Sequence, residues 1–315
     1  MKQKIKKTLV FLLNYALIIL KAVQQYFKEF LFFLQAKRHY IVGDYPKINP
    51  ALCLRKRAHH LERYLFMPQA YSESFGKKAF AQLEKVISIE KNLPISQLKW
   101  ANKIITEFNN LSINENTACP MLLNKVQRTE AASVTTEQFQ ELIRSRRSRR
   151  IFENVPLTLE EKNLICEAAQ QIPSSCNRQT LYLIFVENPS LKEFISATIP
   201  GGYQFFSRAP CILLLLSDAG DYRYPDDRMV PYIEGAAAIQ NIYLLCETMG
   251  LGCCWGSYTS FGSVKNEREV RQKLNIPNNY LIVASLAIGK SRQFVCNIPR
   301  DKPENRYWTD YYGAS

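Results

Sequence analysis

Apolar positions dominate the start of the chain. Two apolar runs, 9–13 and 15–20, are followed by further aromatic positions up to residue 34. This pattern predicts one long or broken helix over residues 1–36. A membrane span needs about 20 apolar residues, and Asn14 makes the run short for that. Two interpretations stay open for this helix, which either lies in a membrane interface or packs on the protein's own body.

The next hundred residues have a helical pattern between two connectors. Residues 37–60 are basic and contain one glycine and two prolines, so they predict a connector. Apolar residues then recur at helical spacing over 75–93 and again over 95–111. Residues 112–133 are polar and predict a linker. We therefore expect a mainly helical extension from residue 37 to residue 133.

Helices and strands alternate in the remaining part, residues 134–315. The predicted helices are 136–143, 158–171, 233–249 and 264–274, and the predicted strands are 181–187, 211–217 and 281–289. Threonines at the starts of the first two helices are typical N-caps. Such alternation indicates an α/β or α+β domain. The chain thus divides into an N-terminal helix, a helical extension and one mixed domain.

Charge separates the same regions. The chain has 315 residues, 47% of them hydrophobic, and a net charge of +13. Residues 1–150 contain 26 Lys and Arg against 11 Asp and Glu, whereas residues 151–315 contain 15 against 17. The basic half favours a phosphate-bearing partner or an anionic membrane surface. A solvated basic surface explains the same excess.

The cysteines and histidines predict no metal site. There are nine cysteines and three histidines, and no C-x-x-C pair occurs. Most of the cysteines lie in apolar runs and are expected to be buried small hydrophobic residues. An odd number without a disulfide pattern fits a reducing cytoplasm. No small-residue cleavage site follows the first helix, so we expect no cleaved secretory signal. The expected location is the cytoplasm, at the inner face of the membrane if the first helix touches it.

The densest chemical signal is a run of arginines. Five of the seven residues 144–150 are Arg. Like charges this close repel one another unless an anion lies among them, and Arg binds phosphate through paired planar donors. Ser148 adds a hydroxyl donor. The alternatives are a solvated basic stretch and a nucleic-acid patch.

A second polar segment lies directly before the predicted strand 181–187. It reads Pro173-Ser174-Ser175-Cys176-Asn177-Arg178-Gln179. Hydroxyls and carboxamides at the mouth of a strand suit a heterocycle with mixed donors and acceptors. An ordinary polar turn has the same composition.

The two segments together resemble the opening motifs of the nitroreductase family. The matching residues are Arg146-Arg147-Ser148-x-Arg150-x-Phe152 and Pro173-Ser174-Ser175-x-Asn177-x-Gln179. Further resemblances follow in order at Glu234–Asn241, Met249–Gly256, Leu274–Tyr280 and Gly289–Arg292. The resemblance covers residues 137–300. One departure is Thr180-Leu181 after Gln179, where the family often has Pro-Trp or Pro-His.

The resemblance implies an α+β fold with a central sheet flanked by helices, an intertwined homodimer and FMN at the dimer interface. By motif, the phosphate and ribityl chain of FMN would be held by Arg146, Arg147, Ser148 and Arg150, with Lys290 and Arg292 near the phosphate. The flavin ring would be bordered by Ser174, Ser175 and Asn177, with Asn177 near flavin N5. Pro173 and Gln179 belong to the same loop and are expected to bind the cofactor with it. Gly256 would offer backbone groups to the other edge of the ring.

The small residues Gly235–Ala238 allow two readings. They let two helices approach closely across a dimer, or they belong to a helix buried inside one subunit. Five aromatic residues between 200 and 225 are likewise either a stacking surface for a planar substrate or part of the core.

The implied function is an FMN-dependent oxidoreductase. Reduced nicotinamide, NAD(P)H, would give hydride to the flavin, and an unidentified small-molecule acceptor would receive it. The cofactor carries this chemistry, so no side chain is assigned as a catalytic acid or base. No specific nucleic-acid binding is expected. The alternative is a catalytically silent binding or regulatory protein of this fold, attached to a membrane or an anionic polymer.

Overall fold

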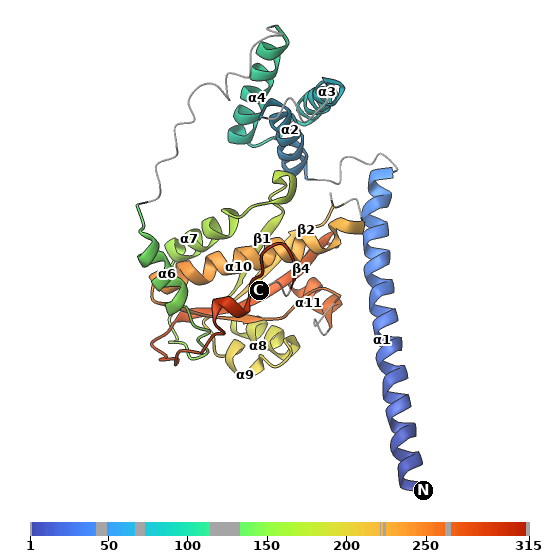
Figure 1. Ribbon diagram of the computed structural model, residues 1–315, viewed down its shortest axis with the longest axis vertical. Coiled ribbons are helices and arrows are strands. Elements are labelled where there is room, and N and C mark those ends of the chain that lie inside the picture. Colours follow the sequence, from blue (N-terminus) through green and yellow to red (C-terminus); the bar gives the residue numbers. More distant parts are fainter. Residues whose placement is uncertain are drawn as a thin grey trace.

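The computed structural model describes residues 2–41, 49–66, 73–113, 133–220, 222, 225–261 and 266–312 (Figure 1). The helices are α1 (Lys2–Ile41), α2 (Pro50–Phe66), α3 (Glu73–Ile89), α4 (Ile95–Ile113), α6 (Thr136–Ser145), α7 (Leu159–Gln170), α8 (Pro189–Thr198), α9 (Tyr203–Phe206), α10 (Val230–Thr248) and α11 (Glu267–Lys273). The strands are β1 (Leu181–Val186), β2 (Cys211–Asp218), β3 (Leu251–Gly256) and β4 (Tyr280–Lys290), and short 3₁₀ turns are η3 (Ser175–Asn177), η4 (Pro225–Met229) and η5 (Pro303–Asn305).

The four strands form one antiparallel sheet in the order β1-β2-β4-β3. Side chains of the fully buried β2 alternate between two cores, as the period of a strand requires. Leu213 and Leu215 face α7 and α10, whereas Leu214 and Leu216 face α8, α9 and α11. Helices therefore cover both faces of an antiparallel sheet, and the α+β fold expected from the sequence is confirmed.

Capping boxes start both helices that lead into this domain. The Gln138 N–H donates to Thr135 Oγ1 at 3.2 Å before α6, and the Glu161 N–H donates to Thr158 Oγ1 at 3.1 Å before α7. These bonds satisfy backbone donors that the first turn of a helix leaves free. The threonines predicted as N-caps therefore set where these helices begin.

Helices α2, α3 and α4 have a core of their own, with Leu61, Leu83 and Ile104 almost fully buried in it. Figure 1 shows the three helices gathered at one end of the molecule. We call α2, α3 and α4 the N-terminal helical unit. The connector expected over 37–60 is wrong at both ends, because α1 continues to Ile41 and α2 starts at Pro50, at a helix position where proline is favoured. The division of the chain at residue 134 stays a prediction, and residues 114–132 lie outside the described part.

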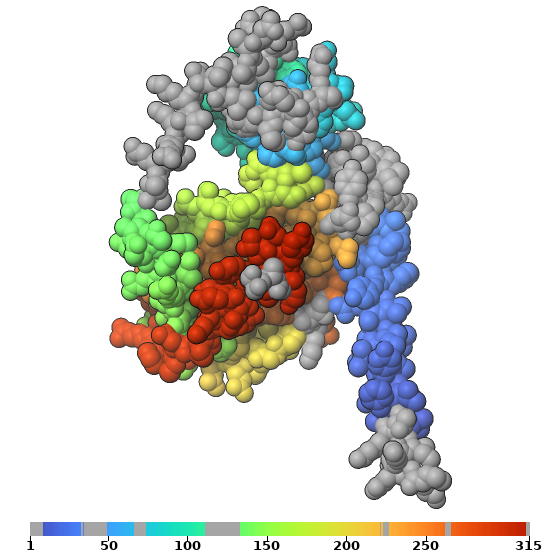
Figure 2. Space-filling model, in the orientation of Figure 1, coloured from blue at the N-terminus to red at the C-terminus, as the bar shows by residue number. Residues whose placement is uncertain are grey.

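Helix α1 is continuous and lies largely apart from the rest of the molecule (Figures 1 and 2). Its contacts with the body include an edge-to-face pair between Phe32 and Phe261, with ring centroids 5.3 Å apart, and Glu29 beside Arg228 at 4.0 Å. The described residues contain one helical segment, Leu9–Phe32, that is both long enough and apolar enough to cross a membrane. The expectation that the run is too short is therefore wrong on length, because aromatic residues extend it beyond Lys21.

Three elements of the domain escaped the sequence pattern: β3, α8 and the four-residue α9. Strand β3 contains two glycines and no β-branched residue, which hides its strand character. Helix α8 begins at Pro189, with Asn188 as its cap. The small residues of α10 pack inside the subunit, because a side-chain carbon on Gly235 would lie 2.8 Å from Val283 of β4. For Gly235 and Ala238, the reading as a helix buried in one subunit is correct.

Candidate functional site

The arginine segment is pinned to the edge of the sheet directly after α6. Ser148 forms a parallel bridge with Cys253 of β3, and the Arg149 N–H donates to the Cys253 carbonyl at 2.9 Å. This backbone pairing holds alternate side chains on different sides, so neighbouring arginines have different surroundings.

Arg149 points into the protein and is neutralised there. Its two terminal nitrogens donate to the carboxylate of Glu247 at 2.5 and 2.8 Å. This hydrogen-bonded pair raises the pKa of Arg149 above its usual value. Arg149 therefore stabilises the segment and leaves the other arginines facing outward.

The remaining arginines line a cavity of about 560 Å³. Its lining includes Arg144, Arg146, Arg147, Ser148, Arg150 and Arg300, together with Ile143, Val295, Asn297 and Ile298. No acidic residue is among these lining residues. A concave surface with several guanidinium groups and no carboxylate attracts an anion. We call it the basic cavity.

Aromatic rings and carbonyls support the guanidinium groups of this cavity. Arg146 lies over the ring of Tyr243 at 5.2 Å, and Arg150 lies over the ring of Phe205 at 5.7 Å. Arg147 donates to the carbonyl of Arg146 at 2.8 Å and to Asn297, yet its Nε atom is buried without a partner in the described part of the chain. An anion bound in the cavity would provide the missing hydrogen-bond acceptor for this buried N–H group.

The structure does not bring Lys290 and Arg292 into the basic cavity. Arg292 is 93% exposed and pairs with Glu153 at 3.1 Å. Its neighbour Gln293 contacts the arginine segment instead, because its side-chain oxygen accepts from the Arg150 N–H at 2.7 Å. Lys290 is exposed, and its carbonyl accepts a hydrogen bond from the Glu153 N–H at 2.8 Å. The later segment 295–300 supplies the cavity wall instead. Arg300 was missed, because no motif marks it and only the path of the chain brings it near.

The second predicted segment forms a tight loop held by a buried carboxylate. The Ser175 N–H donates to Glu234 at 2.7 Å, and the Ser174 hydroxyl donates to the same carboxylate at 3.2 Å. Burial raises the pKa of Glu234 above its usual value, although these donors oppose the shift. Glu234 begins the segment Glu234–Asn241 that resembles the family, where the sequence predicted no role for it. In the structure its carboxylate anchors this loop.

Unusual backbone angles shape the same loop. Cys176, Asn177 and Gln179 have φ between 52° and 53°, the left-handed region that non-glycine residues rarely adopt. Gln179 Nε2 donates to Asn177 Oδ1 at 2.8 Å, and both side chains are at least partly accessible. Pro173 is exposed at the loop entrance. The loop thus presents amide groups at the surface beside β1.

Gly256 ends β3 in a crowded place. A side-chain carbon there would lie 2.7 Å from both Phe206 and Ser285. Its carbonyl already accepts from the Ser285 hydroxyl at 3.2 Å and from the Tyr258 N–H at 2.8 Å. The Gly256 carbonyl is therefore used inside the subunit, which removes one of the backbone groups expected to face the flavin.

Within one chain, the two predicted halves of the site stay apart. Among the described residues, no member of the loop 173–179 lines the basic cavity. The loop contacts α2 and α10 instead. A ligand that needs both halves must take them from two different copies of the chain or require a rearrangement of one copy.

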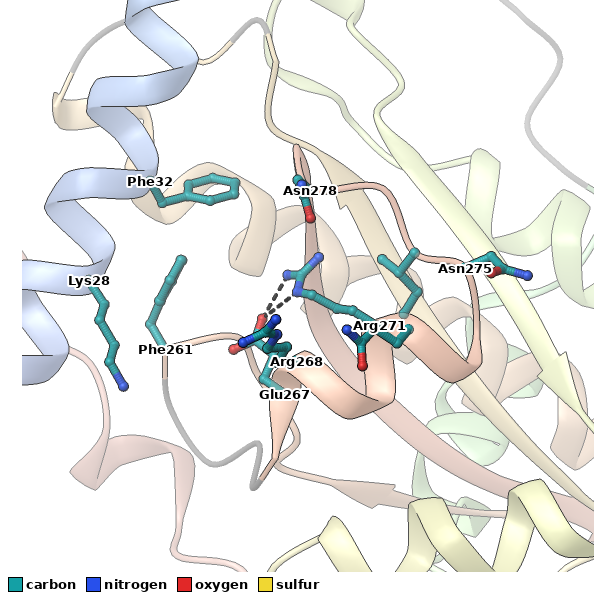
Figure 3. Close-up of a pocket in the computed structure, with 10 residues that line it drawn as sticks. Lys28, Phe32, Phe261, Glu267, Arg268, Arg271, Asn275 and Asn278 are labelled. Atoms are coloured by element: carbon teal, nitrogen blue, oxygen red, sulfur yellow. Dashed lines mark hydrogen bonds and ion pairs between the residues drawn. The ribbon is translucent and has the colours of Figure 1, made fainter.

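A second cavity, of about 670 Å³, lies between α1 and α11 (Figure 3). Phe32 and Phe261 lie on one side of it, and Arg271 donates to Glu267 at 2.7 Å on the other. It contains none of the predicted cofactor residues. Its best-placed guanidinium is already paired with a carboxylate, so it is a poorer phosphate site than the basic cavity.

Known proteins resemble the C-terminal part of the chain. The model of the nitroreductase family matches residues 143–201 and 198–290. An Archaeoglobus fulgidus protein named for NADH dehydrogenase or NAD(P)H nitroreductase activity is 28% identical over 154 residues, which are 49% of this chain and 85% of that protein. The FMN reductase (NADPH) of Bacillus subtilis is 25% identical over 191 residues, covering 56% of this chain and 74% of that one.

The solved structure of the NfrA1 nitroreductase from Bacillus subtilis superimposes with a TM-score of 0.49 and 25% identity, over 56% of this chain and 75% of that chain. The residues that the family model matches contain the arginine segment, the loop 173–179 and all four strands. Residues 143–290 of this chain therefore form a domain of the nitroreductase family of oxidoreductases.

Proposed function

We propose that this protein is an FMN-dependent oxidoreductase that takes hydride from reduced nicotinamide and delivers it to a small-molecule acceptor. The observation that carries the proposal is the basic cavity, whose arginines have no acidic residue among them. An FMN phosphate carries close to two negative charges and matches such a donor set. The relatives named for FMN reduction and NADPH support the choice of cofactor and donor.

The chain's own residues would bind and orient the cofactor. Arg146, Arg147 and Arg150, with Ser148 and Arg300, would hold the phosphate in the basic cavity. Asn177 and its loop would border the ring, and the Glu234 carboxylate would hold the loop through its bond with the Ser175 N–H. Bound FMN would supply reversible hydride chemistry. The protein then contributes position and positive charge, and no side chain is assigned to proton transfer.

The proposed active unit is a homodimer with FMN between the subunits. Helix α6 has no buried residue, and its Phe139 and Ile143 are almost half exposed. Ile233 of α10 is 64% exposed, and Trp308 and Tyr312 project from the C-terminal segment, which Figure 2 shows on the same face as α6. Apolar surface of this extent is typical of a protein interface. A second copy would also supply the missing half of each site.

Purified protein is expected to be yellow and to contain one FMN per chain. Anaerobic addition of NADH or NADPH should bleach the flavin absorption, and a suitable acceptor should restore it. Absorption spectroscopy and extraction of the flavin measure both steps. A correctly folded, colourless protein that takes up no added FMN contradicts the proposal and favours the catalytically silent alternative.

We further propose that α1 lies in the plane of an acidic membrane surface, which places the enzyme at the inner face of the cell membrane. Asn14, Lys21, Gln25, Lys28 and Phe32 follow one another at helical spacing and share one face. Phe32 contacts the body, and Lys28 lines the cavity against α11, so this polar face lies toward the protein (Figure 3).

The opposite face of α1 is apolar and free. Leu12, Ile19, Val23 and Phe30 lie there at helical spacing, and each is about half exposed or more. A helix with this face in the lipid and its polar face toward the protein lies along the membrane rather than across it. Four lysines within the first seven residues add attraction to acidic headgroups.

A lysine placed on the apolar face is expected to release the protein from vesicles. Val23→Lys should weaken binding to vesicles of acidic phospholipid by about tenfold, the loss expected for one buried valine. Gln25→Lys adds the same charge on the polar face and should bind at least as well as the wild type. Co-sedimentation at low and high salt measures the effect. Equal binding of both variants, or binding that resists high salt and alkaline washing, contradicts the in-plane arrangement.

A further inference from the structure

Arg55 of α2 is a buried cation whose partners are neutral. The residue is only 7% exposed. Its Nε and Nη2 atoms donate to the Arg178 carbonyl at 3.1 and 2.7 Å, and Nη2 also donates to the Gln179 carbonyl at 3.3 Å. Nη1 donates to Gln97 Oε1 of α4 at 3.1 Å. Burial lowers the pKa of Arg55, as expected where no carboxylate compensates the lost hydration.

A buried guanidinium bonded to carbonyls is a costly way to stabilise a fold. Desolvation of a charge costs several kcal/mol, and hydrogen bonds to neutral acceptors offset less of that cost than an ion pair with a carboxylate does. Such a group is more readily explained by the geometry that it fixes. Here it fixes two successive carbonyls of one loop, since a planar guanidinium offers its donors in fixed directions.

Those carbonyls belong to the loop proposed to border the flavin ring. The Arg55 fork sets the orientation of the peptide groups that follow Arg178 and Gln179. The Gln179 N–H donates to Ser174 Oγ at 2.8 Å, and the Gln179 side chain donates to Asn177. Fixing the backbone at Gln179 therefore also fixes how Asn177 is presented.

A second bond joins the same helix to the sheet. Asn49, which caps α2 by accepting from the Ala51 N–H at 3.0 Å, donates to the hydroxyl of Tyr182 in β1 at 2.7 Å. The Tyr182 ring lies 5.1 Å from that of Tyr280 in β4. Helix α2 is thus attached to the loop at Arg178 and to the following strand β1 at Tyr182.

We propose that the N-terminal helical unit serves the active site by holding the flavin-ring loop in shape, and that Arg55 is its positioning residue. This inference rests on the proposed function for the identity of the ligand. The contact between α2 and the loop does not, because its hydrogen bonds join protein atoms to protein atoms.

The test uses full-length protein with Arg55→Gln and Arg55→Lys, and with Arg57→Gln as the matched control. Arg57 is two residues away on α2, but it bonds Gln82 of α3 at 2.5 Å, inside the helical unit. Hydrogen exchange of the backbone amides of residues 174–180 is measured without added flavin, and FMN affinity is measured by fluorescence quenching. The flavin absorption spectrum of each bound form reports the surroundings of the ring.

In Arg55→Gln, the loop amides should exchange about tenfold faster or more, and FMN should bind about tenfold more weakly. Arg55→Lys keeps the charge without the fork and should give intermediate values with a shifted flavin spectrum. Arg57→Gln should match the wild type. Unchanged exchange and unchanged affinity in folded Arg55→Gln and Arg55→Lys overturn the inference. If wild-type protein takes up no FMN, the proposed function fails, while the exchange result still decides whether Arg55 shapes the loop.

Discussion

The double variant Arg146→Ala, Arg150→Ala is expected to lose most of its bound FMN. Both guanidinium groups line the basic cavity and rest on aromatic rings, and neither forms an ion pair with a described residue. Charged hydrogen bonds contribute about 1.5–3 kcal/mol each, so losing two should raise the dissociation constant about a hundredfold or more. Fluorescence titration of the apoprotein with FMN measures this change directly.

Arg292→Ala is the informative control. The family motif places this side chain near the phosphate, whereas the structure pairs it with Glu153 at the surface. It should bind FMN within about twofold of the wild type, as expected for an exposed ion pair. Unchanged affinity in the folded double variant, or equal losses in the double variant and the control, would place the phosphate elsewhere.

Mixed dimers are expected to recover one normal flavin site. One chain would carry the Arg146 and Arg150 substitutions, and the other would carry Asn177→Gly. Glycine keeps the left-handed backbone of Asn177 while removing its side chain. In a dimer whose sites take the basic cavity from one chain and the loop from the other, one site inherits both defects and the other inherits neither. Half of the sites should then bind FMN with wild-type affinity.

The mixed species can be isolated by giving the two chains different affinity tags and purifying on both. Each homodimer of one variant provides the baseline for its own defect. If a single chain supplies both groups, every site in the mixed dimer carries one defect and no normal site appears. Wild-type protein that stays monomeric and fully loaded with FMN in dilute solution would equally exclude the shared site.

The sequence predicted those parts of the fold that depend on local signals. Thr135 and Thr158 cap their helices as expected, since a capping box is encoded within four residues. Strand β3 was missed, because its glycines are selected by crowding against Phe206 and Ser291, which are distant in sequence. Phe206 and Tyr222 proved to be core residues, and the sequence alone gives no means of distinguishing a buried ring from a stacking surface.

The candidate site divides along the same line. The arginine segment and the loop 173–179 are contiguous and were found by motif. Arg300 lies 153 residues after Arg147 in the sequence, and Arg55 comes from another folded unit. Only the path of the chain brings them to the two halves of the site, so no local pattern reports them. Tertiary contacts between distant segments are what the sequence leaves open here.

The left-handed backbone of Cys176, Asn177 and Gln179 limits how this enzyme can be re-engineered. A library that randomises residues 176–179 will be filtered first by backbone conformation, which favours Gly, Asn and Asp and penalises β-branched residues at three of the four positions. Few chemically diverse variants would survive that filter. Phe205, whose ring lies 5.7 Å from the Arg150 guanidinium, has φ outside the left-handed region, so substitutions there are not subject to this backbone filter.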